Sequence, residues 1–389
     1  MINFNNTQQA FISKSNKELK WGYRLFTIMA SPRLQNISQK LAKLAIKLKL
    51  PIYGIVKKTL FIQFVGGETL NKCLPVVETM GKHNVKSILD YSVEGKEDEA
   101  DILEALEETI RSIKNAGNTK SIPFSVFKPT AMSKSSILKK ASSGEPLSSE
   151  DKVEVQKLKD RINTLCKTAF EADTSILIDA EDFSYQKIID DTADEMMAIY
   201  NKEKAIVFNT WQMYRHDRLE HLKQTYQKSV KGNYYLGAKF VRGAYMEKER
   251  ELAEQNGVPS PIQPNIEATA NAYNAALKFS IEHLDRISIF NGTHNAESNK
   301  LLCELMEAKG LRRNDKRIWF SQLYGMSDHI SFNLAATGYN VAKYLPYGPV
   351  KHVLPYLLRR AEENSSVEGQ SNRELSLIKA ELKRRKSGQ

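Results

Sequence analysis

Two cationic side chains and two small residues stand together in the segment AKFVRGAYMEKE, residues 238–249. Lys239 and Arg242 lie three positions apart, and Gly243 and Ala244 follow Arg242 directly. Small residues let backbone amides approach a ligand closely, and cations beside such amides suit a pyrophosphate. The same residues could instead form a strand edge with surface charges. The segment by itself leaves both interpretations open.

Hydrogen-bonding side chains follow another apolar run in NGTHNAES, residues 291–298. Thr293 and His294 can donate hydrogen bonds, and Asn295 can cap a following helix. The N-terminus of that helix would favour an anion. A single His in a loop is more often structural or solvated than catalytic. Together with the cationic segment described above, however, a functional role for His294 is as well supported as a structural one.

A pair of arginines stands in the segment YLLRRAEEN, residues 356–364. Arg359 and Arg360 would project about 100° apart from a helix, with Glu363 one turn further on. A guanidinium group binds a carboxylate through two parallel hydrogen bonds, so the pair could hold a small acid. The alternative is a solvated arginine pair on an exposed helix face, which is the commoner situation.

Eight short β-branched or apolar runs recur along the chain and alternate with segments of helical periodicity. They cover residues 85–92, 122–130, 175–182, 205–212, 235–245, 286–294, 317–325 and 339–348. Strands that alternate with helices form parallel βαβ units, and eight such units predict an α/β fold, the (βα)8 or TIM barrel. Ser148 with Asp151 predicts the start of the helix before the third strand, and the seventh helix must be brief, near Ser327–Gly338.

Each predicted strand ends in polar residues, which suits a barrel because its active site lies at the carboxyl ends of the strands. These residues are Asp90, Tyr91, Lys128, Asp179, Glu181, Asn209, Gln212, Lys239, Arg242, Asn291, Thr293, His294, Gln322, Tyr324, Lys343 and Tyr344.

The regions outside the strands suggest three parts. We predict a helical N-terminal extension over residues 1–80, the barrel over residues 81–367 with a helical insertion at about 133–165, and a basic tail over residues 368–389. Basic residues concentrate at Lys40–Lys58 and Arg373–Lys386. Either segment could lie on an anionic membrane or pack against the rest of the protein.

Composition excludes several classes of protein. The 389 residues are 41% hydrophobic and 26% charged, so wholesale disorder and collagen-like architectures are excluded. The net charge is +11, but no nucleic-acid-binding motif accompanies it. The sequence shows no Rossmann or P-loop motif, membrane span, signal peptide or metal motif, which predicts a cytoplasmic protein without a metal. His216 and His221 predict a solvated helix face, and three widely spaced cysteines fit a reducing compartment.

Taken together, these motifs resemble the proline dehydrogenase (proline oxidase) family, in its single-function, eukaryote-like branch. The matching segments are VRGAY, the Thr-His-Asn of NGTHN, QLYGM, YLPYG, LLRRAEEN, LDYSVEG and LIDAED, in order along residues 85–367. The resemblance implies a distorted barrel that holds FAD non-covalently at the carboxyl ends of its strands. It implies oxidation of L-proline to 1-pyrroline-5-carboxylate by hydride transfer to the flavin, the first step of proline catabolism. A membrane quinone would take the electrons, with a peripheral contact at the inner membrane.

The resemblance also assigns residues. Lys128, Arg359 and Arg360 should hold the substrate carboxylate, Tyr344 should pack on the proline ring and Leu323 should cover it. Asp179 and Lys239 should be catalytic, although many bacterial members carry Arg in place of Lys239. The expected cofactor contacts are Ala180, Asn209, Gln212, Lys239, Arg242, Gly243, Ala244, Tyr245, Thr293, His294, Asn295 and Glu363.

Two other functions fit parts of this pattern. A flavin barrel that dehydrogenates hydroxyproline or another cyclic amine would keep the arginine pair and differ at Tyr344. A non-catalytic basic scaffold that binds membrane or nucleic acid would share only the charge, and it would be colourless when purified.

Overall fold

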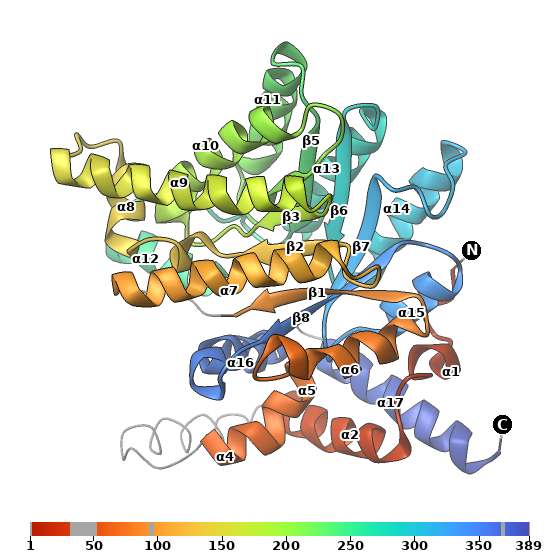
Figure 1. Cartoon of the computed structure of the whole chain (residues 1–389). Helices are drawn as coiled ribbons and strands as arrows, with labels where there is room; N and C mark the ends of the chain where they lie inside the picture. The colour runs from red at the N-terminus through yellow and green to blue at the C-terminus, as the bar shows by residue number, and fades with distance from the viewer. Residues whose placement is uncertain (1, 32–52, 93–96, 367–369, 389) are drawn as a thin grey trace.

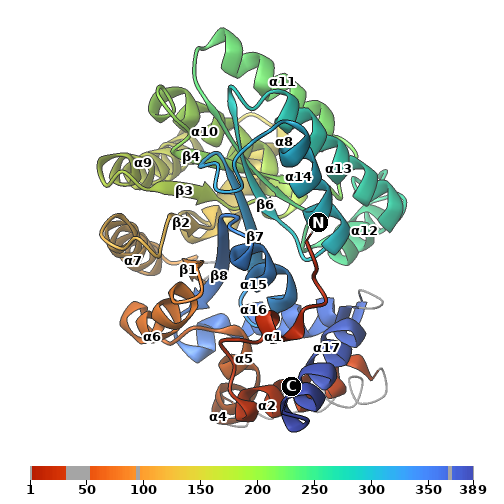
Figure 2. The ribbon, with the colours of Figure 1, turned by 90° about the vertical axis from the view of Figure 1, so that its right-hand side faces the viewer.

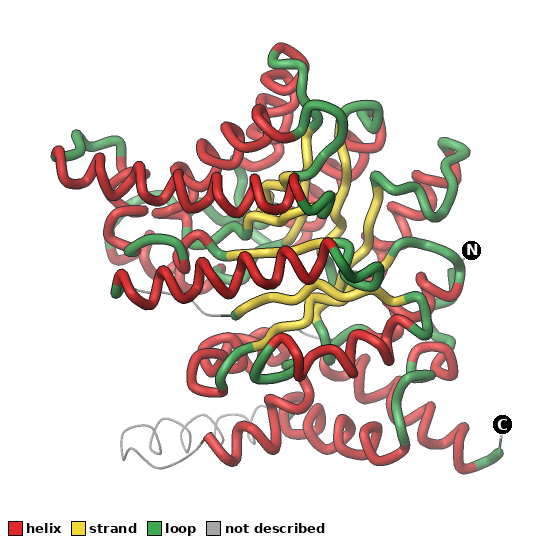
Figure 3. The backbone as a smooth tube through the Cα atoms, viewed as in Figure 1, coloured by secondary structure: helices red, strands yellow, loops and turns green. Residues whose placement is uncertain are grey.

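Eight parallel strands close into a barrel in chain order, with β1 paired to β8 in the computed structural model. The structure describes residues 2–31, 53–92, 97–366 and 370–388. Figure 3 shows the strands enclosed by helices, as the sequence predicts. The strands are β1 (Val85–Tyr91), β2 (Phe124–Phe127), β3 (Ser175–Ile178), β4 (Val207–Gln212), β5 (Leu236–Val241), β6 (Ile287–Gly292), β7 (Ile318–Leu323) and β8 (Val341–Tyr347).

Helices cover the outside of the barrel (Figure 1). They are α6 (Leu70–Gly81), α7 (Glu99–Gly117), α9 (Ser149–Glu171), α10 (Phe183–Tyr200), α11 (Arg218–Lys231), α13 (Ile266–Glu282), α14 (Ala296–Ala308), α15 (Asp328–Ala336) and α16 (Val350–Ser366), with η2 (Pro129–Ala131), α8 (Ser135–Ser143) and α12 (Met246–Gln255) in the loops. Ser148 caps α9 by accepting a hydrogen bond from Asp151 N, and α15 is the brief seventh helix, as predicted. Within the insertion between β2 and β3, α8 is the added element, because α9 buries Leu158 and Ile162 as a barrel helix.

Side chains alternate between two cores along each strand. The rings of Phe124, Phe208 and Phe290 meet edge to face inside the barrel, whereas Val207 and Trp211 face the surrounding helices. This alternation follows from the pleat of a β-strand, in which successive side chains point to opposite faces. It decides which of the strand-end polar residues can reach the barrel mouth.

The two ends of the chain form one layer of helices below the barrel in Figure 1 and Figure 2. This layer contains α1 (Thr7–Ala10), α2 (Asn16–Ala30), α4 (Tyr53–Val56), η1 (Lys57–Phe61), α5 (Ile62–Phe64) and α17 (Gln370–Lys386). Phe26, Phe64 and Ile378 are buried where these helices meet. The N-terminal region is therefore helical where it is described, although α6 packs against β1 as part of the barrel wall.

The predicted basic tail is folded against this layer. Glu381 binds Arg384 and Arg385, and Arg385 also donates hydrogen bonds to the carbonyl oxygens of Phe11 and Lys14. These two arginines are thus occupied within the molecule. Most of the other basic segment, Lys40–Lys58, lies outside the described residues.

His221 does not lie on a solvated face. Its Nδ1 accepts a hydrogen bond from Trp211 Nε1 at 3.0 Å, so this nitrogen carries no proton. Burial and the charge of Arg218 lower the pKa of His221 to about 4. His216 is exposed as expected, although it lies in the turn before α11 and not on a helix. The charged run correctly predicts that His216 is exposed to solvent. It wrongly predicts the same for His221, because His221 turns towards the barrel wall.

In the described parts of the chain, we find no helix that combines the length and the apolar character needed to cross a membrane.

Candidate active site

Ionisable side chains from five strands meet inside the barrel at its carboxyl end. Asp90 and Tyr344 belong to β1 and β8, Lys239 belongs to β5, and Lys128 and Asp179 directly follow β2 and β3. Each occupies an inward position of the alternating pattern, which brings residues far apart in sequence into contact. All except Asp179 are less than 10% exposed. We call these residues the strand-end cluster.

Asp179 is the centre of the strand-end cluster. Lys239 Nζ donates to Asp179 Oδ1 at 2.5 Å and to the Tyr344 hydroxyl at 2.7 Å. The Tyr344 hydroxyl in turn donates to Asp179 Oδ1 at 2.9 Å. Lys128 Nζ lies 3.4 Å from Asp179 Oδ2 and 3.1 Å from Asp90 Oδ2. Two ammonium groups and two carboxylates therefore balance within one buried network.

The network determines the charge of its members. Burial alone would raise the pKa of Asp179, but Lys239 and Lys128 hold it below its usual range. Burial lowers the pKa of Lys239, and Asp179 opposes that effect. Burial and the charge of Asp179 raise the pKa of Tyr344 well above its usual value, so its phenol stays neutral. A carboxylate with a low pKa is a weak base, which suits Asp179 to orienting charge better than to removing a proton.

A second group surrounds Arg242 at the end of β5. Its guanidinium donates to Thr293 Oγ1 and to Ser298 Oγ, the latter at 3.1 Å, and lies 4.5 Å from the centre of the Tyr273 ring. Asn295 caps α14 by accepting a hydrogen bond from Ser298 N, as predicted. A cation and a helix N-terminus therefore lie side by side, which is the arrangement that favours an anion.

Gly243 is required by the backbone next to Arg242. Its φ is +135°, and a Cβ at this position would lie 2.5 Å from the ring of Tyr214. Only glycine fits both the dihedral angle and the space. Ala244 is exposed directly after it, so the chain presents a bare stretch of backbone beside the Arg242 guanidinium.

Gln212 presents a buried acceptor towards the barrel mouth. Its Nε2 donates to the carbonyl oxygen of Glu181 at 2.9 Å. Within the described residues no donor reaches Gln212 Oε1, although this atom is buried. Buried polar atoms are almost always hydrogen-bonded, so an unpaired acceptor at the mouth of a barrel fits a site for a ligand that donates to it. This observation and the bare backbone at Gly243 agree with a bound polar cofactor.

Asn209 does not belong to this site. β4 turns Phe208, Thr210 and Gln212 inwards, so Asn209 faces the helices, where its Nδ2 donates to Asp190 Oδ1 at 2.9 Å. Arg218 binds the same carboxylate. The expected cofactor contact at Asn209 is therefore replaced by a structural one behind the barrel wall.

His294 is already fully hydrogen-bonded. Leu323 N donates to His294 Nε2 at 3.4 Å, so the ring proton belongs on Nδ1, which lies 2.9 Å from Ser327 Oγ. Burial and the nearby cations Lys343 and Arg360 hold the pKa of His294 well below its usual value, and the ring is neutral. His294 thus fixes the loop after β7 and offers no free N–H to a ligand, in contrast to the expected donor role.

The remaining predicted residues lie around the barrel mouth. The Arg359 guanidinium lies 5.8 Å from the centre of the Tyr245 ring, which brings α16 to the segment after β5. Arg360 is buried beside Tyr356. Leu323 ends β7 and packs against the apolar core inside the barrel. Ala180 follows Asp179 and is half-buried, and the side chain of Glu363 lies outside the described residues.

Two charged strand-end residues, Asp90 and Lys343, have no functional role assigned from the sequence. Asp90 binds Lys128 and accepts a hydrogen bond from Ser92 Oγ at 2.7 Å. Asp90 is one of the polar residues at the strand ends. Its inward position on β1 is the feature from which its place beside Lys128 could have been predicted. Lys343 was also among the strand ends, but it faces outwards and pairs with Asp328 Oδ1 at 2.8 Å.

A model of the proline dehydrogenase family matches residues 73–373 of this chain. The chain is 36% identical over 325 residues to the carbapenem antibiotics biosynthesis protein CarD of Pectobacterium carotovorum, covering 84% of both chains. It is 31% identical over 426 residues to proline dehydrogenase 1, mitochondrial, of Dictyostelium discoideum, covering 98% of this chain and 74% of that protein.

A solved structure has the same fold. The crystal structure of proline utilization A from Bdellovibrio bacteriovorus, inactivated by N-propargylglycine, superposes with a TM-score of 0.72 at 20% identity. The match covers 92% of this chain and 38% of that protein, so the chain spans well under half of its length. At 20% identity, this similarity shows that the two proteins share the barrel fold with its surrounding helices.

Proposed function

Because the chain belongs to the proline dehydrogenase family, we propose that it oxidises L-proline to 1-pyrroline-5-carboxylate by hydride transfer to FAD. The observation that carries this proposal is the strand-end cluster, in which Lys128, Asp179, Lys239 and Tyr344 form one buried network at the carboxyl end of the barrel. A barrel places its active site at that end. The family resemblance assigns Lys128 and Tyr344 to the substrate, and Asp179 and Lys239 to catalysis.

In this proposal the side chains bind and orient the substrate. Lys128, with Arg359 and Arg360 from α16, holds the carboxylate, and Tyr344 and Leu323 pack on the ring. Holding a reactant in one geometry can lower a barrier by up to about 7–11 kcal/mol. Asp179 stays ionised and orients Lys239, and we propose that the amine reaches the site after it has lost its proton to solvent.

FAD supplies the two-electron acceptor chemistry, which amino-acid side chains lack. The residues that would hold it are Gln212 through its unpaired buried Oε1, the backbone at Gly243 and Ala244, and Arg242 beside Thr293. Lys239 would lie against it with a positive charge. Tyr245, Asn295 and Ala180 complete the proposed contacts, and His294 supports them from the loop after β6.

We predict that Tyr344 excludes ring-hydroxylated substrates. Its hydroxyl is fixed by Lys239 and Asp179, so the ring cannot move aside for an added oxygen. Replacing Tyr344 by Ser should lower the preference for L-proline over 4-hydroxyproline by roughly tenfold, since a contact of this size is worth about 1–3 kcal/mol. Tyr344→Phe should also lower it, because it loses the two hydrogen bonds that fix the ring. Steady-state kinetics with both substrates tests this.

The same kinetics addresses the second candidate function. If wild-type protein oxidises 4-hydroxyproline or another cyclic amine faster than L-proline, that substrate replaces L-proline in the proposal. An unchanged preference in Tyr344→Ser would show that the discrimination arises elsewhere.

We further propose a membrane quinone as electron acceptor, with a cytoplasmic enzyme that touches the inner membrane peripherally. Exposed Lys379, Lys383 and Lys386 on α17 support a contact with anionic lipid. Vesicles of anionic lipid that contain a quinone test both the membrane contact and the quinone as electron acceptor. The enzyme should sediment with them at low salt and pass electrons to the quinone, and failure to do either would reject the corresponding part.

A further inference from the structure

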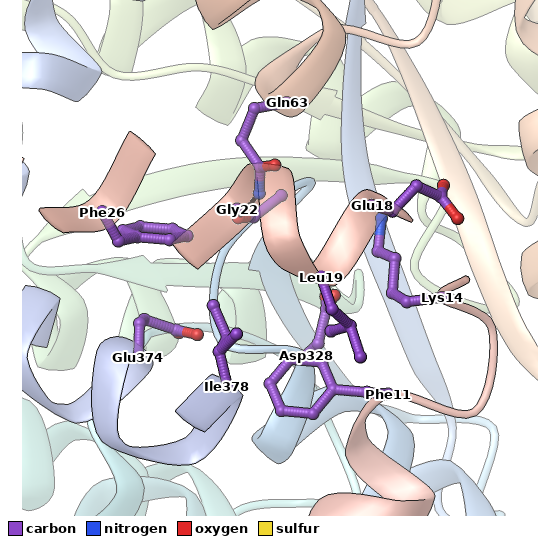
Figure 4. Close-up of a pocket in the computed structure, with 11 residues that line it drawn as sticks. Phe11, Lys14, Glu18, Leu19, Gly22, Phe26, Gln63, Asp328, Glu374 and Ile378 are labelled. Carbon is purple, nitrogen blue, oxygen red and sulfur yellow. Dashed lines mark hydrogen bonds between the residues drawn. The ribbon is translucent and has the colours of Figure 1, made fainter. Parts of the chain in front are cut away.

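The loop between β7 and α15, residues 324–327, is held on its outer side by both ends of the chain. Gln63 Nε2 donates to the carbonyl oxygen of Gly325 at 2.7 Å. Ser327 N donates to Glu374 Oε1 at 2.6 Å, and Glu374 belongs to α17. Figure 4 shows Gln63, Glu374 and Asp328 around one small cavity at this junction. The terminal helices therefore contact the loop directly.

The inner side of the same loop faces the proposed active site. Ser327 Oγ binds His294 Nδ1 at 2.9 Å, and Tyr324 N donates to the carbonyl oxygen of Tyr344 at 2.8 Å. His294 in turn binds Leu323 N. A continuous series of hydrogen bonds thus connects Glu374 through Ser327 to His294 and Leu323.

The backbone at Ser327 needs such a restraint. Its φ is +52°, a left-handed conformation that is unfavourable for a residue with a Cβ. Residues keep this conformation when their surroundings fix it, and they concentrate at functional sites. The short hydrogen bond from Ser327 N to the Glu374 carboxylate supplies that restraint from outside the barrel.

The position of Glu374 is unfavourable for stability alone. Its side chain is 3% exposed, and Asp328 adds a second carboxylate nearby. Burying a carboxylate costs free energy, and an apolar residue would anchor α17 to the layer more cheaply. A carboxylate here is therefore better explained by the hydrogen bond that it accepts. Glu374 lies one residue beyond the segment that the family model matches.

We propose that Glu374 is a positioning residue for the active site, which acts by fixing Ser327 so that His294 and Leu323 keep their places at the barrel mouth. This inference rests on the proposed function for its substrate, while the hydrogen-bond geometry stands by itself. α17 is then part of the catalytic unit, although it lies on the outside of the barrel.

Two substitutions of Glu374 separate the effect of its hydrogen-bond acceptor from the effect of its side-chain volume. Glu374→Leu fills similar space without a hydrogen-bond acceptor. It should raise the KM for L-proline about tenfold, while kcat changes less than about twofold. This pattern is expected because Glu374 is coupled to the site but touches no reacting group. Glu374→Gln keeps an oxygen that can accept from Ser327 N, and it should stay close to wild type. The 15N resonances of the His294 ring, assigned by their loss in His294→Gln, should report the Nδ1–H tautomer in wild type and Glu374→Gln and change in Glu374→Leu.

Glu381 provides the matched control, because it is a buried carboxylate on the same helix that binds Arg384 and Arg385 instead of the loop. Glu381→Leu should lower the melting temperature and leave KM and the His294 resonances unchanged. If Glu374→Leu behaves like Glu381→Leu, or if Glu374→Gln behaves like Glu374→Leu, the proposal is overturned.

Ser327→Ala keeps the test decisive if Glu374→Leu does not fold. It removes the partner of His294 while α17 keeps its other contacts, and the His294 resonances should change as in Glu374→Leu. Unchanged resonances would refute the proposed connection. Protein that binds no flavin and ignores L-proline would reject the proposed function, whereas the His294 resonances would still test the connection.

Discussion

Replacing Lys128 by Met is expected to lower kcat/KM for L-proline by a hundredfold to a thousandfold, mainly through a higher KM. Lys128 is buried and is one of the cations proposed to meet the substrate carboxylate. Without it, Asp90 and Asp179 face the incoming carboxylate with less compensating charge, because Lys128 Nζ lies within 3.4 Å of both. Truncating one partner of a buried charge pair costs about 2–5 kcal/mol, which corresponds to this range of rates. Steady-state kinetics measures the loss.

Lys140 offers a matched control for this experiment. It pairs with Asp151 at 2.9 Å on the surface, and its side chain is 54% exposed. Lys140→Met therefore removes a Lys–Asp pair without touching the barrel mouth, and kcat/KM should not change. Lys128→Arg should recover part of the activity because it keeps the charge. A normal KM in Lys128→Met would show that Lys128 does not bind the carboxylate.

Replacing Lys239 by Met is expected to lower kcat about a thousandfold, whereas Lys239→Arg should stay within about tenfold of wild type. Lys239 is the cation that would lie against the flavin, and a fixed charge at a reacting centre is worth about 3–4 kcal/mol. Arginine keeps that charge and changes its hydrogen-bonding geometry. Single-turnover reduction by L-proline, recorded at equal flavin content, measures the effect.

Lys239→Met should also change the pH dependence of the reaction. Lys239 and Lys128 together hold the pKa of Asp179 below its usual range against the effect of burial. Without Lys239, burial is opposed only by Lys128 and the hydrogen bond from Tyr344, so the pKa of Asp179 rises. The acid limb of the kcat/KM profile should then move to higher pH, because Asp179 becomes protonated earlier as the pH falls. An unmoved acid limb, or equal activities of Lys239→Met and Lys239→Arg, would contradict this role.

Much of the fold could be predicted from local patterns. The eight strands and the caps at Ser148 and Asn295 depend on residues close together in sequence, and all are present. The strand-end cluster was also foreseeable, since parallel strands in a barrel bring their carboxyl ends together. Lys128 and Asp179 could be placed there before their partners were known.

The errors share a physical cause. Asn209 lies in the same strand as Gln212 but faces the opposite way, because the face that each residue of β4 presents depends on where β4 starts. His221 and His294 were assigned from their immediate neighbours, but Trp211 and Ser327 decide their states. The contact between Glu374 and Ser327 joins segments 47 residues apart, and no local pattern marks it. Tertiary contacts, rather than propensity, settle these positions.

The most direct test of the proposed activity is the visible spectrum of the purified protein before and after anaerobic addition of L-proline. We expect a flavin spectrum that bleaches when L-proline is added and returns when a quinone is supplied. Bound flavin that L-proline leaves unchanged would contradict the proposed substrate and direct attention to other cyclic amines. Protein that binds no flavin, even after incubation with FAD, would contradict the assignment of the barrel mouth as a flavin site.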